Sequence, residues 1–335
     1  MANRGKKGRS KVLKRMLLSL LALFVVTSYL FAVSERAALP DPLPFDNSAL
    51  ADINGIRFHY RTYPPKDGAD KGKLLLVHGL AGSTFSFDTA APLICAGGYL
   101  VVSVDLPGFG YSDRSPLYDH SQKNRARDLW QLLSLIDRGL DSDTAVEPWH
   151  LAGHSMGGGT VAAMAMQAPQ RTTSAIFIDA ALFESPRGIW PLAIPLLDRW
   201  VLLTLENILL TEKRITGLLA SAYGTEPAPE QVEGYLAPLR LPGTARALLN
   251  FIRTAENEDP KGLRGLNVPI LAVWGSEDTW VPREELNRLI AIRPDTVARL
   301  IEEAVHCPME THPEAFADIV LKWLSEPGSD PSQPW

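Results

Sequence analysis

Cysteine is scarce in this sequence. Only Cys95 and Cys307 occur among 335 residues, so no disulfide framework can hold the fold together. If the chain folds as argued below, the two thiols lie too far apart to form a bridge, and both are expected to be free. An apolar core must supply the stability instead, and 46% hydrophobic residues in a chain of this length are enough for one. Neither disorder nor a fibrous class fits this composition.

An excess of basic residues is also missing from most of the chain. The net charge is −5, yet residues 1–15 carry seven basic side chains and no acidic one. Removing those seven positive charges leaves −12 for the remaining 320 residues, which argues against nucleic acid as a partner. Internal repeats are absent, and low complexity is confined to a Pro/Ser-rich tail over residues 327–335, which we expect to be disordered.

One long apolar run does occur, over residues 16–33, with no charged side chain. Its 18 residues reach the lower limit for a helix that spans a bilayer core about 30 Å thick. The basic segment 1–15 before it predicts a cytoplasmic N-terminus, a single-pass membrane anchor and a following domain on the extracytoplasmic side. The alternative is a signal helix cleaved after residues 32–34, which would leave a secreted or periplasmic protein. A buried core helix fits least, because the run has no polar stripe.

The rest of the chain alternates between short apolar segments and helical stretches. Continuous apolar strands separated by helices predict an α/β fold, with a mostly parallel central sheet and helices on both faces. A hairpin at Asn54 and Gly55 opens the domain. Residues 296–301 can add a strand. The main predicted strands are residues 73–78, 99–105, 149–153, 175–179 and 269–275.

Between residues 183 and 261 the alternation of strands and helices stops, and the sequence shows only helical patterns. We interpret this stretch as a helical cap inserted into the α/β core. The predicted organisation is a basic cytoplasmic segment 1–15, an anchor or signal helix 16–33, a linker 34–48, a core formed by 49–182 and 262–326, a cap 183–261 and a tail 327–335.

The motif with the clearest chemistry is Gly153-His154-Ser155-Met156-Gly157. It follows an apolar strand and precedes a helix rich in small residues, which is the context of a nucleophile elbow. The glycines allow a tight, strained turn that presents the Ser155 hydroxyl at the carboxyl edge of the sheet. The backbone N–H of Met156, at the start of the helix, can then donate to an oxyanion.

A serine hydroxyl needs a base, and the base needs a third group that orients it. Asp278 follows a predicted strand and His306 lies in a later loop, so both stand at carboxyl ends of strands. Glu277 and Asp179 are rival acids, and His312 is a rival base that is better explained as a surface residue. The remaining histidines outside these motifs, His59, His120 and His150, are expected to be ordinary surface or strand residues.

The chain from about residue 50 to 326 resembles the α/β-hydrolase fold superfamily, which includes serine esterases, lipases and haloperoxidase-like members with a helical cap. Four motifs carry the resemblance: residues 78–82 (HGLAG), residues 105–112 (DLPGFGYS), the elbow at 153–157, and Gly275-x-x-Asp278 together with His306. These motifs are specific for the fold and the catalytic triad, and much less specific for the substrate.

The resemblance also implies roles for neighbouring residues. Leu80 would provide the second oxyanion N–H, and His78 and Gly79 would form the supporting loop. His154, inside the elbow, would pack or line the substrate pocket. In the cap, Trp190 and Trp200 are among the apolar residues that could face an acyl chain.

The function expected from these features is hydrolysis of a carboxylic ester through Ser155, His306 and Asp278, by way of an acyl-enzyme. No cofactor is required. No metal is expected either, because the cluster of His306, Glu310 and His312 lacks a recognised ligand spacing. Carbon–carbon bond hydrolases, perhydrolases and acyltransferases use the same triad, and a slow-turnover receptor for a small ligand could also carry it. The expected partners are a small-molecule or lipid ester and a membrane through residues 16–33; the oligomeric state stays open.

Overall fold

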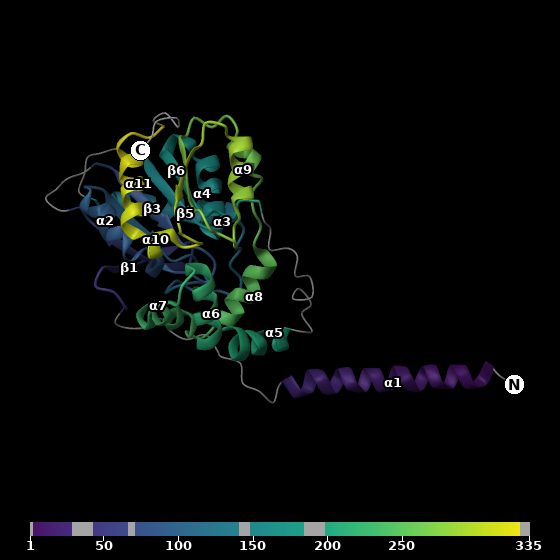
Figure 1. Ribbon diagram of the computed structural model, residues 1–335. Coiled ribbons are helices and arrows are strands. Elements are labelled where there is room, and N and C mark those ends of the chain that lie inside the picture. The colour runs from purple at the N-terminus through teal and green to yellow at the C-terminus, as the bar shows by residue number, and fades with distance from the viewer. Residues whose placement is uncertain (1–2, 29–42, 66–70, 141–147, 184–197, 329–335) are drawn as a thin grey trace.

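The computed structural model describes residues 3–28, 43–65, 71–140, 148–183 and 198–328 (Figure 1). Eight strands form one sheet in the order β1-β2-β4-β3-β5-β6-β7-β8. Strands β1 and β2 pair antiparallel, as do β2 and β4, and every other pair is parallel. This confirms the predicted α/β fold with a mostly parallel sheet. The strands are β1 Ser48–Ile53, β2 Ile56–Tyr63, β3 Lys73–Val77, β4 Leu100–Val104, β5 Trp149–His154, β6 Thr172–Ile178, β7 Ile270–Gly275 and β8 Val297–Ile301.

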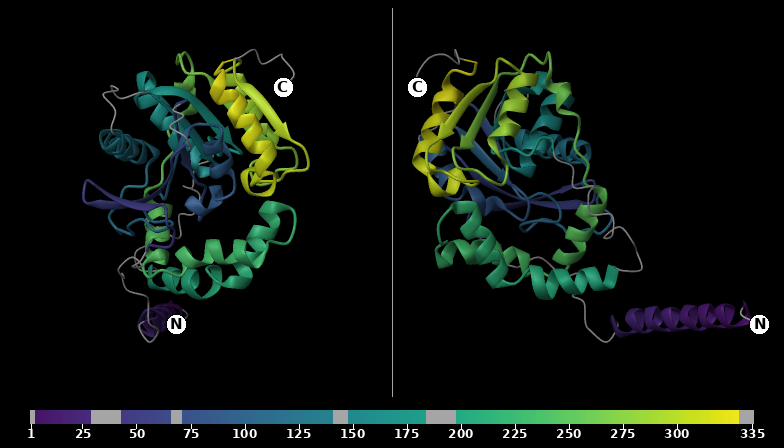
Figure 2. Two further views of the ribbon diagram at one scale, coloured as in Figure 1. Left: turned by 90° about the vertical axis from the view of Figure 1, so that its left-hand side faces the viewer. Right: turned by 45° about the vertical axis from the view of Figure 1, so that its right-hand side comes forward.

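The central strands are buried because helices cover both faces of the sheet (Figure 2). One face packs against α3 (Gln122–Gly139), α4 (Met156–Gln167) and α9 (Arg283–Ile292). The other packs against α2 (Ala90–Ala96) and α11 (Pro313–Ser325). Continuous apolar runs in the strands follow directly from this two-sided burial.

The first two strands are joined by the predicted tight turn. Asn54 and Gly55 both have positive φ, 55° and 77°, as the favoured two-residue hairpin turns require. The two cysteines form no disulfide, as expected, and both are buried.

Helices alone connect β6 to β7 in the described part of that connection, and they lie together beyond one end of the sheet (Figure 1). We call the helices of this connection between residues 198 and 254 the cap. They are α5 (Asp198–Thr204), the short π-helix Leu205–Leu209, α6 (Glu212–Tyr223), α7 (Pro229–Leu239) and α8 (Thr244–Thr254). Shorter helices elsewhere are η2 (Thr84–Phe87), η3 (Pro169–Arg171), η8 (Pro260–Leu263) and α10 (Pro308–Thr311).

The N-terminal helix α1 spans Asn3–Ser28 and projects from the domain (Figure 1). The prediction of a membrane-spanning helix over 16–33 is not supported, because no helix in the described ranges is long and apolar enough to cross a bilayer. The reason lies in where α1 is placed along the sequence. Any 18 consecutive residues of α1 include Lys11, Lys14 and Arg15, and residues 29–33 of the apolar run lie outside the described ranges.

Candidate active site

The predicted elbow is a sharp turn between β5 and α4. Ser155 has φ 49° and ψ −117°, a strained backbone for a residue other than glycine. Its neighbours must be small: a Cβ on Gly153 would lie 2.3 Å from the Gly157 carbonyl oxygen, and one on Gly157 would lie 2.4 Å from the Val77 carbonyl oxygen. Glycine is therefore required at both positions. Met156 is the first residue of α4, so its N–H has no acceptor within the helix.

Asp278 and His306 form a hydrogen-bonded pair at the end of the neighbouring strands. His306 Nδ1 lies 2.8 Å from Asp278 Oδ2, and Asp278 Oδ1 accepts from the N–H groups of Trp280 at 2.7 Å and Val281 at 3.1 Å. Burial by itself would raise the pKa of Asp278, but hydrogen bonding to His306 and the other donors lowers it below the ordinary value. Asp278 is therefore a charged carboxylate, and Nδ1 of His306 carries the proton that it accepts.

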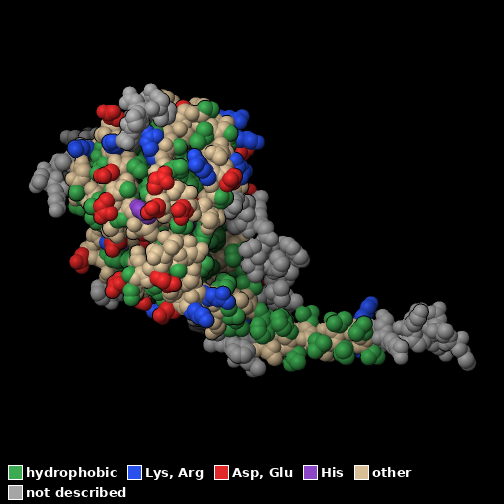
Figure 3. Space-filling model, in the orientation of Figure 1, with side chains coloured by type: hydrophobic (Ala, Val, Ile, Leu, Met, Phe, Trp, Pro, Cys, Tyr) green, Lys and Arg blue, Asp and Glu red, His purple; other side chains and the backbone are tan. Residues whose placement is uncertain are grey.

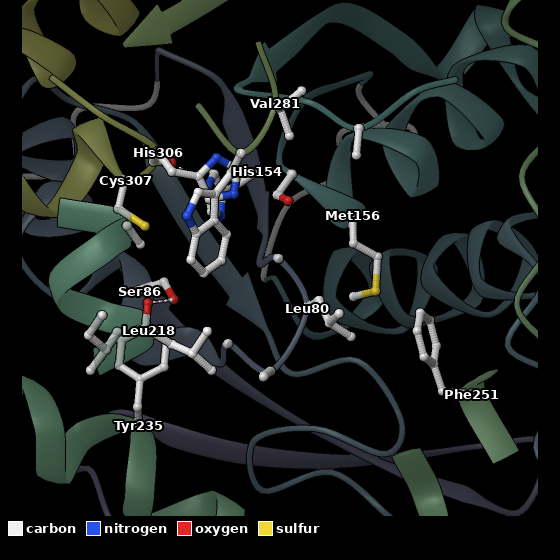
Figure 4. A pocket seen from close by; sticks show the side chains of 18 of the residues that line it. Leu80, Ser86, His154, Met156, Leu218, Tyr235, Phe251, Val281, His306 and Cys307 are labelled. Atoms are coloured by element: carbon white, nitrogen blue, oxygen red, sulfur yellow. Dashed lines mark hydrogen bonds between the residues drawn. The ribbon is translucent and has the colours of Figure 1, made fainter. Parts of the chain in front are cut away.

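Ser155 and His306 both line one cavity of about 460 Å³ (Figure 4). Leu80 and Met156 border the same cavity, as does His154. The structure thus brings the predicted nucleophile, base and both oxyanion residues to one cavity. Most of its remaining lining is apolar: Ala81, Ala181, Ile215, Leu218, Leu219, Ala222, Leu239, Phe251, Ala255, Trp280 and Val281.

His154 holds the loop that carries His306. Its Nε2 lies 2.8 Å from the His306 carbonyl oxygen, and the two rings are 4.7 Å apart. Burial, followed by the proximity of His306, lowers the pKa of His154 to about 3. A neutral His154 therefore donates Nε2–H to that carbonyl. The backbone N–H of His306 also donates to the carbonyl oxygen of Ala222 in α6, at 2.9 Å.

The loop after β3 is held by His78. Its Nδ1 lies 2.7 Å from the Gly79 carbonyl oxygen, and its Nε2 accepts from the Leu106 N–H at 3.0 Å. Burial lowers the pKa of His78, so the ring is neutral. One of its nitrogens bonds within this loop and the other bonds to the segment after β4. A Cβ on Gly79 would come within 2.9 Å of His154 Nδ1, so this loop packs directly on the elbow.

The rival acid Asp179 lies beside the pair. Ligand atoms of Asp179, Asp278 and His306 fall within 4.8 Å of one another, a grouping that could also hold a metal ion. Asp179 is completely buried and accepts the Gly275 N–H at 2.9 Å. Burial, and then the charge of Asp278, raise the pKa of Asp179 well above its ordinary value. Asp179 is therefore neutral and Asp278 holds the charge, which accounts for two buried carboxyl groups standing this close.

Trp280 also belongs to the site, although it was not predicted from the sequence. Its ring stacks on His306, with centroids 5.2 Å apart and an angle of 29°. Its Nε1 donates to Ser221 Oγ in α6 at 3.0 Å. An aromatic residue two positions after the acid was the available signal.

The two cap tryptophans expected to face an acyl chain fare differently. Trp190 lies outside the described residues. The expectation for Trp200 is wrong, because its ring stacks on Phe24 of α1 at 4.5 Å and it is absent from the cavity lining. The apolar character of Trp200 therefore serves contact with the N-terminal helix.

Comparison with known proteins agrees with this geometry. Residues 74–319 match the model of the "Alpha/beta hydrolase family". The "Uncharacterized hydrolase YugF" of Bacillus subtilis is 27% identical over 277 residues, which are 81% of this chain and 96% of that protein. "Lipase 1" of Psychrobacter immobilis is 28% identical over 252 residues, covering 73% of this chain and 74% of that protein.

Solved structures show the same fold. A thermophilic esterase from Thermogutta terrifontis superposes with a TM-score of 0.65 at 22% identity, covering 83% of this chain and 97% of the esterase. A membrane phospholipase A superposes with a TM-score of 0.64 at 20% identity, covering 95% and 94% of the two chains. Because the family model spans most of the chain, this protein belongs to the α/β-hydrolase family and is an enzyme.

Proposed function

We propose that the enzyme cleaves carboxylic esters with Ser155 as nucleophile, His306 as general base and Asp278 as the acid that orients the base. The observation that carries the proposal is the shared cavity. Ser155, on its strained turn, borders it together with a histidine whose Nδ1 is already hydrogen-bonded to a charged carboxylate. That pairing leaves Nε2 of His306 as the free basic nitrogen, which is what proton removal from a serine requires.

In this mechanism His306 takes the Ser155 proton as the hydroxyl oxygen attacks the ester carbonyl. Asp278 stabilises the imidazolium that forms. The backbone N–H groups of Leu80 and Met156 receive the developing oxyanion, where one donor is worth about 3 kcal/mol. His306 then passes its proton to the leaving alcohol, and water hydrolyses the acyl-enzyme by the reverse path.

The lining supports an ester with an apolar acyl or alcohol part. Aliphatic side chains of α6 and α7 and the Phe251 ring of α8 surround the cavity, so a hydrocarbon chain loses its contact with water there at a gain of about 0.8 kcal/mol per methylene. The lipases and esterases among the similar proteins fit this class of substrate.

Covalent labelling tests the nucleophile. The protein should react with a fluorophosphonate probe and turn over p-nitrophenyl esters, and Ser155→Ala should abolish both. His312→Ala is the matched control, because the His312 ring contacts the Thr311 hydroxyl and is not part of the cavity lining; it should keep both activities. Full activity in Ser155→Ala would refute the proposal.

We further propose that α1 attaches the enzyme to a membrane surface. Its large apolar side chains are exposed (Figure 3), and exposed apolar surface of this extent calls for a partner. Lys14 and Arg15 are also exposed and can meet anionic head groups. The exposed apolar residues are Val12, Leu13, Met16, Leu17, Leu18, Leu20, Leu21, Leu23, Phe24 and Val26.

Fractionation tests this attachment. The intact protein should sediment with membranes, and a Leu17→Glu/Leu21→Glu variant should move to the supernatant. Mass analysis of the mature N-terminus separates attachment from cleavage: a chain that begins after residue 33 would favour a secreted or periplasmic enzyme, and would refute attachment through α1.

A further inference from the structure

One end of the mostly apolar cavity carries a pair of polar side chains. Ser86 of η2 and Tyr235 of α7 both line the cavity, and their hydroxyl oxygens are 2.9 Å apart (Figure 4). Met156 and Phe251 lie at the other end of the cavity in this view (Figure 4). Two hydroxyl groups facing an apolar space are costly to desolvate unless they meet a polar partner.

Behind this pair stands Glu310, a buried carboxyl group of α10. The Tyr235 hydroxyl donates to Glu310 Oε1 at 2.6 Å, and the Tyr223 hydroxyl donates to Oε2 at 2.7 Å. Among the described residues, no lysine, arginine or histidine lies within ion-pair distance of Glu310. The two tyrosines, from α6 and α7, are therefore its main stabilising partners, with the Cys307 thiol as a further donor.

The protons of Ser86 and Tyr235 determine whether this part of the cavity wall offers hydrogen-bond donors or acceptors. A phenol has one proton. Burial raises the pKa of Glu310 to about 7, so above about pH 7 the carboxylate is charged and Tyr235 gives its proton to it. The Tyr235 oxygen therefore accepts the proton of Ser86, since one of the two hydroxyls must be the donor in their contact. With both protons committed, the Ser86 and Tyr235 oxygens offer only lone pairs to anything else in the cavity.

We propose that Ser86 and Tyr235 form a subsite that binds a hydrogen-bond donor, a hydroxyl group on the chain of the ester substrate. The preferred substrates are then hydroxylated esters, so this inference rests on the proposed ester hydrolysis. An unsubstituted chain leaves the two lone-pair sites unmatched, and a chain carrying only acceptors, such as an ether or a second carbonyl, meets them with the wrong polarity.

The same contacts also tie the cap to the core, because they join α6, α7, η2 and α10. That structural role makes a different prediction. Loss of any of these hydrogen bonds would then weaken all ligands alike. A recognition role instead requires that only the two residues lining the cavity change the preference between ligands. Tyr223 does not line the cavity, so it separates the two roles.

Binding to the inactive Ser155→Ala enzyme tests the subsite without relying on turnover. Dissociation constants would be measured by calorimetry for methyl octanoate and for its monohydroxylated positional isomers. We expect one isomer to bind about fivefold more tightly than methyl octanoate, the gain of one neutral hydrogen bond. Adding Ser86→Ala or Tyr235→Phe to this enzyme should remove the preference, and adding Tyr223→Phe should leave it intact.

Three results would overturn the subsite: no isomer that binds more tightly than methyl octanoate, a preference that survives both Ser86→Ala and Tyr235→Phe, or an equal loss of preference in Tyr223→Phe. None of these outcomes depends on ester cleavage. Failure of the catalytic proposal would show instead as persistent fluorophosphonate labelling or ester turnover in Ser155→Ala.

Discussion

The two carboxyl groups beside His306 should respond very differently to the same change. Asp278→Asn should lower kcat/KM for a p-nitrophenyl ester about 10³- to 10⁴-fold, because the amide neither stabilises the imidazolium nor enforces the proton on Nδ1. Asp179→Asn should stay within about threefold of the wild type. The amide oxygen can still accept the Gly275 N–H that Asp179 accepts now, and Asp179 is already neutral.

The magnitude follows from the spacing. Two carboxylates with oxygens no more than 4.8 Å apart would repel by at least about 3.5 kcal/mol at an effective dielectric constant of about 20, so the site holds one negative charge. The lowered pKa of Asp278 and the raised pKa of Asp179 put that charge on Asp278. In Asp278→Asn the repulsion disappears, and Asp179 can ionise and partly replace the lost charge. The double variant should therefore lose about tenfold more activity than Asp278→Asn alone.

The assay is a set of initial rates for the wild type, both single variants and the double variant, with circular dichroism to establish that each is folded. If Asp179→Asn lost as much activity as Asp278→Asn, the charge assignment would be wrong and Asp179 would be the acid. A double variant equal to Asp278→Asn would refute the replacement by Asp179.

Three further predictions concern folding. Gly157→Ala should lower the melting temperature sharply, because its Cβ would overlap a strand carbonyl oxygen. Gly217→Ala in α6, with no atom within 4 Å of the added Cβ, should raise stability by up to about 1 kcal/mol. Calorimetric scans of both variants test this difference, and equal effects would contradict the geometry. Asp137→Ala should lower the free energy of unfolding, measured by urea denaturation, by about 3 to 5 kcal/mol. The buried Lys73 ammonium lies 2.7 Å from the Asp137 carboxylate and would be left unpaired. A loss under about 1 kcal/mol would argue against a buried pair. Burial lowers the pKa of three histidines, His120 to about 2, His154 to about 3 and His150 to about 4. Their stabilisation is present above the unfolded pKa of about 6.5 and is lost as the pH falls from there toward about 4. Glu310, with a pKa raised by burial to about 7, opposes this between its unfolded pKa of about 4.5 and 7, so Glu310→Gln should steepen the fall of the melting temperature on acidification; an unchanged slope would refute the assignment.

Features set by local sequence were predicted well. The strain of the elbow is confined to a few residues around Ser155, and glycines at fixed positions reveal it. The hairpin at Asn54 and Gly55 is local in the same way. The strand pattern reflects burial on both faces, which leaves a continuous apolar run in the sequence even though the partner strands are distant.

Contacts that depend on packing between distant segments were not predictable. The hydrogen bond from His154 to the His306 carbonyl joins residues 152 positions apart, and that between Ser86 and Tyr235 spans 149. His120 illustrates the same limit: it was expected to be an ordinary surface or strand histidine, yet it lies in a loop and is fully buried, with Nδ1 3.2 Å from an Arg125 nitrogen. Apolar character also misled, since Trp200 packs on α1 and not on the cavity.

The hydrogen bond from the His306 N–H to the Ala222 carbonyl couples the position of the cap to the position of the catalytic base. Any ligand that favours the observed position of α6 also favours the observed position of His306, and by reciprocity anything that fixes the imidazole stabilises the cap. A transition-state analogue bound at Ser155 should therefore slow amide hydrogen exchange in α6. Occupancy of the cavity and the position of the base are then coupled. The cap of this enzyme therefore influences the catalytic base as well as covering the cavity.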